Sequence, residues 1–76
     1  MKRHVEIDTE YIKLSNLLQL ADVVGTGGQA KLIIQDRLVK VNDEWCTQRG
    51  RKIYPGDKVN VILEPATEIT VNKSEE

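Results

Sequence analysis

The sequence predicts an α+β domain in which two short packed helices lie against a small antiparallel sheet. Over residues 27–36 apolar side chains recur at helical spacing, and beyond Asp36 the pattern changes to the alternation of a strand across 38–42. A second clean alternation covers 58–63. With 76 residues the chain has room for one small domain, so these segments must share a single core.

The helix predicted at 27–36 carries its own start signal. Thr26 is followed three residues later by Gln29. This is the spacing of a capping box, in which each of the two side chains accepts a hydrogen bond from a backbone amide at the helix start. Ala30 and Ile34 then fall on one face together with Ile33, which gives the helix an apolar side to bury.

Another helix is predicted near 15–21, with Ser15 as its N-cap. Four apolar residues there follow the i, i+3, i+4, i+7 rule of an amphipathic helix: Leu14, Leu17, Leu18 and Ala21. Gly25, in the short connection, is available for a positive φ. Since neither helix can bury its apolar face alone, the two should pack as an angled pair, with their starts close together.

The predicted sheet contains 38–42 and 58–63, with a short strand at 3–7 added to an edge. Asn42-Asp43 is a turn-forming pair that leads into a return segment at 44–47. The turn departs from the favoured Asn-Gly, so a two-residue type I′ turn is expected to be weakened here.

The remaining segments are placed by their turn residues and charges. Gln48–Lys52 is expected to be a solvated basic loop, and Pro55-Gly56 favours a type II turn. The single domain is assigned to residues 1–66. Residues 67–76 are expected to form an acidic C-terminal tail, with at most a short edge strand at 69–71 and a frayed end.

Basic charge is concentrated in one stretch, although the formal net charge is −1. Residues 37–58 hold six Lys and Arg against three Asp and Glu, whereas 64–76 hold one Lys against four Glu. Local charge steers a partner more than the total does. The distribution therefore favours a polyanionic partner that the net charge alone would disfavour.

The chain offers little to an enzyme or to a metal ion. A single Cys (Cys46) and a single His (His4) leave too few ligands for a zinc site of Cys and His. There is no Cys-His or Ser-His-Asp set and no carboxylate pair at a recognisable spacing. We expect no catalysis, metal, cofactor or small-molecule substrate.

Compartment and membrane contact follow from the same residues. Cys46 has no internal partner, which favours an unpaired thiol in a reducing cytoplasm. No apolar run approaches the roughly 18–20 residues needed to cross a bilayer, and no apolar segment follows the basic N-terminus as in a signal peptide. A cytoplasmic protein without a membrane partner is expected, as a monomer.

Four blocks of the sequence together resemble the αL motif, the RNA-binding domain first named from ribosomal protein S-four. The resemblance extends over about Val5–Val61 and is strongest to the small stand-alone bacterial proteins of the YaaA/YbcJ type. The four blocks are Lys13-Leu14-Ser15-x-x-Leu18, Thr26-Gly27-Gly28-Gln29-Ala30-Lys31-x-x-Ile34, Val39-Lys40-Val41-Asn42 and Tyr54-Pro55-Gly56-Asp57-x-Val59.

This resemblance implies a non-catalytic module that binds RNA, with rRNA or a ribosomal subunit as partner and a role in ribosome assembly or maturation. The larger family often has an Arg at the start of the second helix, where this chain has Gly28. An RNA-binding face needs cations and exposed amides. The candidate residues are Lys13, Gly27, Gly28, Gln29, Lys31, Lys40, Arg49, Arg51 and Lys52.

Each candidate also has a purely structural interpretation. The glycines at 27 and 28 can simply permit a turn, Gln29 can serve only as a cap, and the cations can be solvated surface charges. Trp45 and Tyr54 could stack on bases, but with no Phe in the chain Trp45 is expected to pack in the core. The alternative function is a protein-binding adaptor without direct RNA contact.

Overall fold

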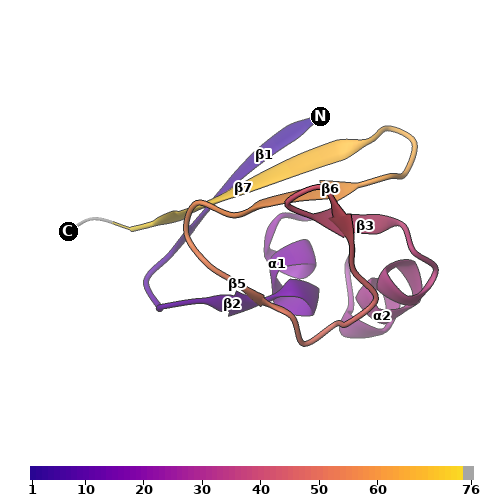
Figure 1. Ribbon diagram of the computed structural model, residues 1–76, viewed down its shortest axis with the longest axis horizontal. Helices are drawn as coiled ribbons and strands as arrows, with labels where there is room; N and C mark the ends of the chain where they lie inside the picture. The colour runs from indigo at the N-terminus through magenta and orange to yellow at the C-terminus, as the bar shows by residue number, and fades with distance from the viewer. Residues whose placement is uncertain (75–76) are drawn as a thin grey trace.

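Two helices lie against one face of a five-stranded sheet, and a two-stranded ribbon flanks them (Figure 1). The computed structural model describes residues 1–74. The helices are α1 (Leu14–Leu20) and α2 (Gly27–Gln35). The strands are β1 (Lys2–Ile7), β2 (Ile12–Lys13), β3 (Val39–Val41), β4 (Glu44–Trp45), β5 (Lys52–Ile53), β6 (Lys58–Val61) and β7 (Thr67–Lys73). The α+β class is confirmed.

The main sheet has the order β1-β7-β6-β3-β4, and β2 pairs separately with β5. Its pairs are antiparallel except for β1 and β7, which run parallel. The sheet is therefore mixed rather than wholly antiparallel. The predicted N-terminal edge strand is present as β1.

Strand β7 is the main departure from the prediction for the C-terminal segment. It lies between β1 and β6 rather than at an edge, and Ile69 and Val71 are fully buried. Pairing continues to the end of the described chain, where the Ser74 amide donates to the Ile7 carbonyl over 2.7 Å. Residues 67–73 thus belong to the sheet and not to a tail, while Glu75 and Glu76 lie outside the described residues.

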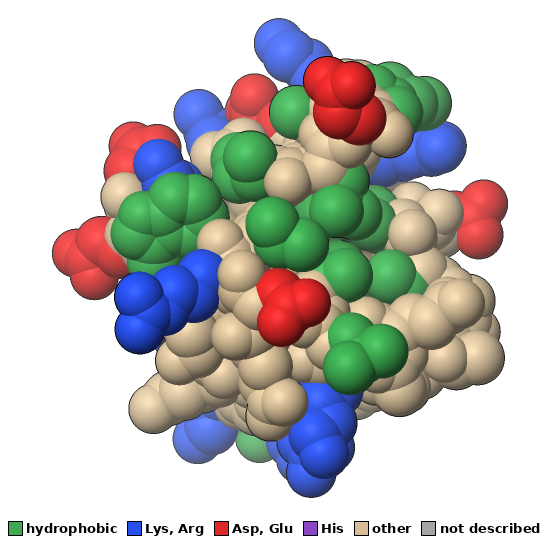
Figure 2. All heavy atoms as spheres, turned by 90° about the vertical axis from the view of Figure 1, so that its right-hand side faces the viewer, with side chains coloured by type: hydrophobic (Ala, Val, Ile, Leu, Met, Phe, Trp, Pro, Cys, Tyr) green, Lys and Arg blue, Asp and Glu red, His purple; other side chains and the backbone are tan. Residues whose placement is uncertain are grey.

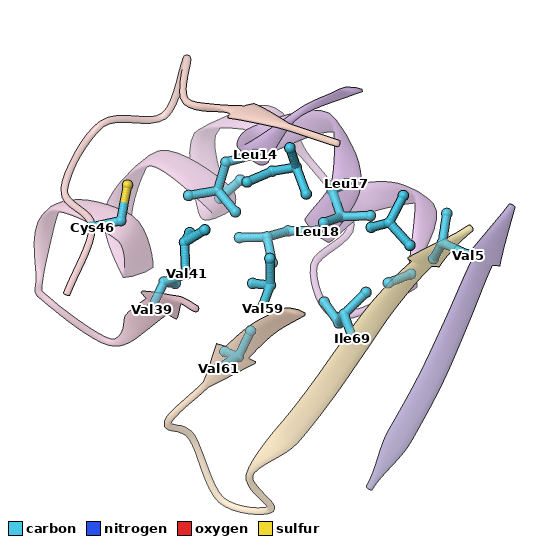
Figure 3. Packing of buried hydrophobic residues seen from close by; sticks show 14 of the residues in the cluster. Val5, Leu14, Leu17, Leu18, Val39, Val41, Cys46, Val59, Val61 and Ile69 are labelled. Carbon is cyan, nitrogen blue, oxygen red and sulfur yellow. The ribbon is translucent and has the colours of Figure 1, made fainter. Parts of the chain in front are cut away.

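The core between helices and sheet is made only of apolar side chains among the described residues. The three leucines of α1 that were expected to face inward are fully buried, and they point toward sheet residues that include Val59 and Ile69 (Figure 3). Cys46 is also buried at this site, as an unpaired thiol.

Trp45 does not pack in the core, contrary to the prediction. Its side chain is 55% exposed, and the Lys40 Nζ lies 4.6 Å from the ring centroid. The register explains this placement, because Trp45 is directly opposite Lys40 and paired residues share one face of a sheet. Val39 and Val41 on either side of Lys40 point into the core, so Lys40 and Trp45 must point outward.

The turns follow the chain's local chemistry, with two corrections. Asn42 and Asp43 both have positive φ (51° and 69°), so they form the two-residue type I′ turn that the Asp was expected to weaken. The Asn42 side chain stabilises it by donating to Asp57 and accepting from the Lys58 amide. Gly25 does not have the positive φ that was expected there. In this connection it is Asp22 that has a positive φ (62°).

The type II turn at Pro55-Gly56 agrees with the prediction. Gly56 has a φ of +96°, and the Asp57 amide donates to the Tyr54 carbonyl over 2.9 Å. The turn follows directly after β5 and brings the chain into β6.

The predicted cap of α2 is present in a modified form. Thr26 Oγ1 accepts from the Gln29 amide over 3.1 Å, as the capping box requires. The Gln29 side chain, however, accepts from the Gly25 amide rather than from Thr26 (2.8 Å). The box therefore reaches one residue further back and fixes the connection between the helices as well as the start of α2.

Removing this cap should weaken the fold measurably. We expect Thr26→Ala to lower the free energy of unfolding by about 1 kcal/mol, because one N-terminal amide of α2 loses its partner. Chemical denaturation measures the change. Thr47→Ala is the matched control, since Thr47 is exposed and its hydroxyl bonds to nothing within residues 1–74. Equal stability of the two variants would show that the cap contributes nothing.

Candidate nucleic-acid interface

The start of α1 is held by the loop that contains Arg49 and Arg51. The Leu14 amide donates to the Arg51 carbonyl (2.9 Å), and the Ser15 amide donates to the Arg49 carbonyl (3.1 Å). These carbonyls satisfy two of the amides that a helix start leaves free. Ser15 is therefore not the N-cap that was predicted: it lies inside the helix, and Lys13 in the N-cap position makes no side-chain cap.

This backbone capping fixes a basic loop beside a helix. The two carbonyls anchor the loop, while the Arg49 and Arg51 side chains remain exposed. Gln48–Lys52 is thus solvated through its side chains, as predicted, but its backbone is part of the fold.

The two helix starts and the basic loop meet in one shallow groove. Packing of α1 against α2 brings the starts together, as the angled pair was expected to do. We call this surface the basic groove, and its lining residues are Lys13, Ser15, Asn16, Gly27, Arg49 and Gly50. Three segments that are far apart in the sequence thereby contribute to one site.

The ribbon of β2 and β5 adds a second cation next to Lys13. Lys13 lies directly opposite Lys52 in the antiparallel register. Like charges directly opposite in a ladder destabilise it, so this pair is a cost to folding. A bound anion would offset the repulsion between the two lysines. Without an anion, the pair contributes nothing favourable to the fold.

The cations in the groove and directly beside it are not neutralised within the described chain. Among residues 1–74 one salt bridge occurs, between Lys58 and Glu68 (3.6 Å), and it lies on β6 and β7. The side chains of Lys13, Arg49, Arg51 and Lys52 are exposed and have no acidic partner there. Their positive potential is therefore available to a ligand.

The start of α2 offers free amides as well as space. As the first two helical residues, Gly27 and Gly28 have no intrahelical partner for their amides, and no other bond is made to them within residues 1–74. Neither has a positive φ, and a Cβ on either would meet its nearest atom at 3.6–3.8 Å, an ordinary contact. The turn therefore does not require glycine at these two positions.

Gly28→Ala should accordingly separate stability from binding. We expect the free energy of unfolding of the variant to equal that of the wild type or to exceed it by up to about 1 kcal/mol, because Ala favours a helix more than Gly does. If a phosphate approaches the backbone here, the same methyl group should weaken RNA binding. Unfolding and RNA titration of one preparation measure both, and unchanged affinity would assign the glycines no part in the interface.

The remaining predicted residues lie at different distances from the groove in the fold. Lys31 is exposed on α2, four residues after Gly27 and hence on the same helix face. Gln29 is occupied by its capping bonds. Lys40 lies on β3 over the ring of Trp45, not among the groove residues.

Sequence reasoning missed Asn16 and Tyr11. Asn16 lines the groove from the exposed side of α1, next to the residue mistaken for a cap. Tyr11 precedes β2 and contacts Tyr54, with a distance of 5.8 Å between ring centroids. The alternation of Tyr11, Ile12 and Lys13 was the available signal, because period two places Tyr11 on the side of Lys13.

A different face of the molecule is apolar. Figure 2 looks onto the side of the molecule at which α2 leads into β3 and β6 finishes. Hydrophobic side chains gather across the middle of this view. Three apolar residues of these segments reach the surface at least in part, since Ile33 and Leu38 are half-buried and Ile62 is exposed, and we call them the apolar face. Their backbones are linked, since the Ile62 amide donates to the Leu38 carbonyl and the Leu38 amide to the Ile33 carbonyl. Ile62 is 44% exposed.

Two comparisons with known proteins agree with this fold and groove. The chain belongs to the S4 domain family, whose model matches residues 5–72, from β1 into β7. It is also 48% identical over 61 residues to a protein of Bacillus subtilis (strain 168) named "Probable ribosome maturation protein RlbA", covering 80% of this chain and 86% of that protein. The resemblance to the domain of ribosomal protein S-four is thereby confirmed.

Residues 1–74 lack two further features. Neither helix is long and apolar enough to span a membrane. No three His, Cys, Asp or Glu side chains in this range come together as a metal site would require.

Proposed function

We propose that this chain is a non-catalytic protein that binds structured rRNA through the basic groove and acts in ribosome assembly or maturation. The observation that carries the proposal is the meeting of Lys13, Gly27 and Arg49 in one groove, with Lys52 directly opposite Lys13. Cations and free helix-start amides are the groups that hold phosphate. The S4 domain and the name of the Bacillus subtilis relative support RNA as the anion and the ribosome as its setting.

The groove suits a phosphate backbone better than a small anion. Its cations come from two segments, Lys13 before α1 and the stretch of residues 49–52, and extend along the start of α1 and the β2–β5 ribbon, so they can meet successive phosphates. The two arginines can each donate two parallel hydrogen bonds to one phosphate, which Lys cannot do. This arrangement positions a folded RNA by its backbone rather than by reading its sequence.

Salt dependence tests the proposal. The logarithm of affinity for rRNA should fall steeply and linearly with the logarithm of salt concentration, because each neutralised phosphate releases counterions. Lys13 and Arg49 in the groove and Arg51 and Lys52 beside it, each meeting one phosphate, predict a slope of magnitude about 3. A flat titration would contradict binding through phosphates. Sedimentation of cell extract, with the protein followed across free RNA, subunits and ribosomes, would then identify the target.

The apolar face supports a second candidate function, an adaptor that binds protein without direct RNA contact. Exposed hydrophobic side chains gathered on one face can mark a protein interface. An adaptor using Ile33, Leu38 and Ile62 should bind ribosomal protein with a shallow salt dependence. Association that survives in high salt and is lost in Ile62→Asp would favour this function over the basic groove.

A further inference from the structure

We infer that the bound RNA places one unpaired nucleotide against Tyr11, in a hollow that continues the basic groove. This inference rests on the proposed function and specifies its ligand. The hollow is lined by Thr9, Glu10, Tyr11, Ile12, Lys13 and Asn16. It shares Lys13 and Asn16 with the basic groove, so the two depressions form one continuous surface.

The hollow differs from the groove in its chemistry. The groove is lined by cations and small polar residues, whereas the hollow carries an aromatic residue and the carboxylate-bearing Glu10. A carboxylate repels phosphate but accepts hydrogen bonds from the N–H groups of a nucleobase. Complementarity therefore assigns phosphate to the groove and a base to the hollow. The hollow is an open depression of about 450 Å³, which leaves room for a single nucleobase.

The aromatic wall is fixed before any ligand arrives. The Thr9 hydroxyl donates to the Tyr11 carbonyl over 2.8 Å, which closes the turn leading into β2. The Tyr11 ring contacts the ring of Tyr54, and the Lys52 Nζ lies over one face of the Tyr11 ring, 4.9 Å from its centroid, which leaves the other face for a base. Tyr11 is thus half-buried and oriented from two sides, so that little entropy remains to be lost when a base packs on it.

A base can reach this wall only if it is not paired. Sequence-specific RNA recognition uses unstacked bases of loops and bulges, which pack on aromatic side chains, because the grooves of a duplex do not admit them. The preferred ligand is therefore an RNA with a helical stem, whose phosphates follow the groove, and an adjacent unpaired nucleotide.

The test uses the full chain and two RNA hairpins with equal numbers of phosphates. One hairpin carries a single bulged guanosine in its stem, and the other has an abasic nucleotide at that position. We expect the guanosine hairpin to bind about tenfold more tightly, within the range of base–aromatic stacking. Tyr11→Leu should abolish this preference without changing the salt slope, and Tyr11→Phe should retain it. Trp45→Leu is the matched control and should leave the preference intact.

The outcomes distinguish failure of this inference from failure of the proposed function. Equal binding of the two hairpins by the wild type would overturn the inference while leaving rRNA binding through the groove in place. Absence of binding to either hairpin, together with a flat response to rRNA, would overturn the proposed function and the inference with it. The wild-type ratio needs no variant, so the test holds even if Tyr11→Leu fails to fold.

Discussion

Replacing Arg49, Arg51 and Lys52 together with Gln is expected to reduce rRNA affinity roughly 100-fold at low salt, since charge-assisted contacts each contribute on the order of 1 kcal/mol or more. The salt slope should fall by up to about one unit per lost phosphate contact. Stability should change little. The carbonyls of residues 49 and 51, which cap α1, remain in place, and exposed charges contribute little to folding. Titrations at several salt concentrations measure both quantities.

The control removes equal charge from another part of the molecule. Lys2, Arg3 and Lys73 are exposed on the paired strands β1 and β7, and none lines the groove. Their replacement with Gln should leave most of the affinity. If the two triple variants lose affinity equally, RNA responds to net charge alone and the groove is not a site.

Ile69→Ala is expected to have the largest effect on stability, a loss of about 2–5 kcal/mol in the free energy of unfolding. Ile69 is fully buried on β7, whose neighbours are β1 and β6, so the truncation leaves a cavity in the core beneath an inner strand of the sheet. For a domain of this size the loss is comparable to the whole stability. Urea denaturation followed by circular dichroism measures it.

The matched variant is Ile62→Ala, which removes the same atoms from a side chain that is 44% exposed. It should cost much less than Ile69→Ala. Equal, small losses in both variants would mean that residues 67–73 behave as the peripheral tail predicted from the sequence rather than as an inner strand.

Local signals in the sequence predicted most of the fold. Thr26 and Gln29 marked the start of α2, and alternation marked β3 and β6, because caps and periodicity depend on residues close together in the chain. Strand β7 was underestimated for the opposite reason. Its partner β1 lies at the other end of the chain, with Val5 opposite Val71, and no local pattern reports such a pairing.

The candidate site was predicted as one basic face formed by the two helix starts and the basic loop, but not the backbone contacts that hold this face together. The sequence identified Lys13, the glycines of α2 and the basic loop, since charge and glycine are visible residue by residue. It did not show that the carbonyls of Arg49 and Arg51 cap α1, because backbone groups are the same in every residue. Trp45 was misplaced because its orientation depends on its register with Lys40.

Chemical-shift mapping of the backbone amides during titration with rRNA tests the central claim most directly. If RNA binds the basic groove, the largest changes will fall on residues 11–16, 27–31 and 48–52, and they will diminish as salt is raised. The amides of β1 and β7 will change little. Changes concentrated instead at Ile33, Leu38 and Ile62, or spread evenly over the surface, would contradict binding of RNA through the groove.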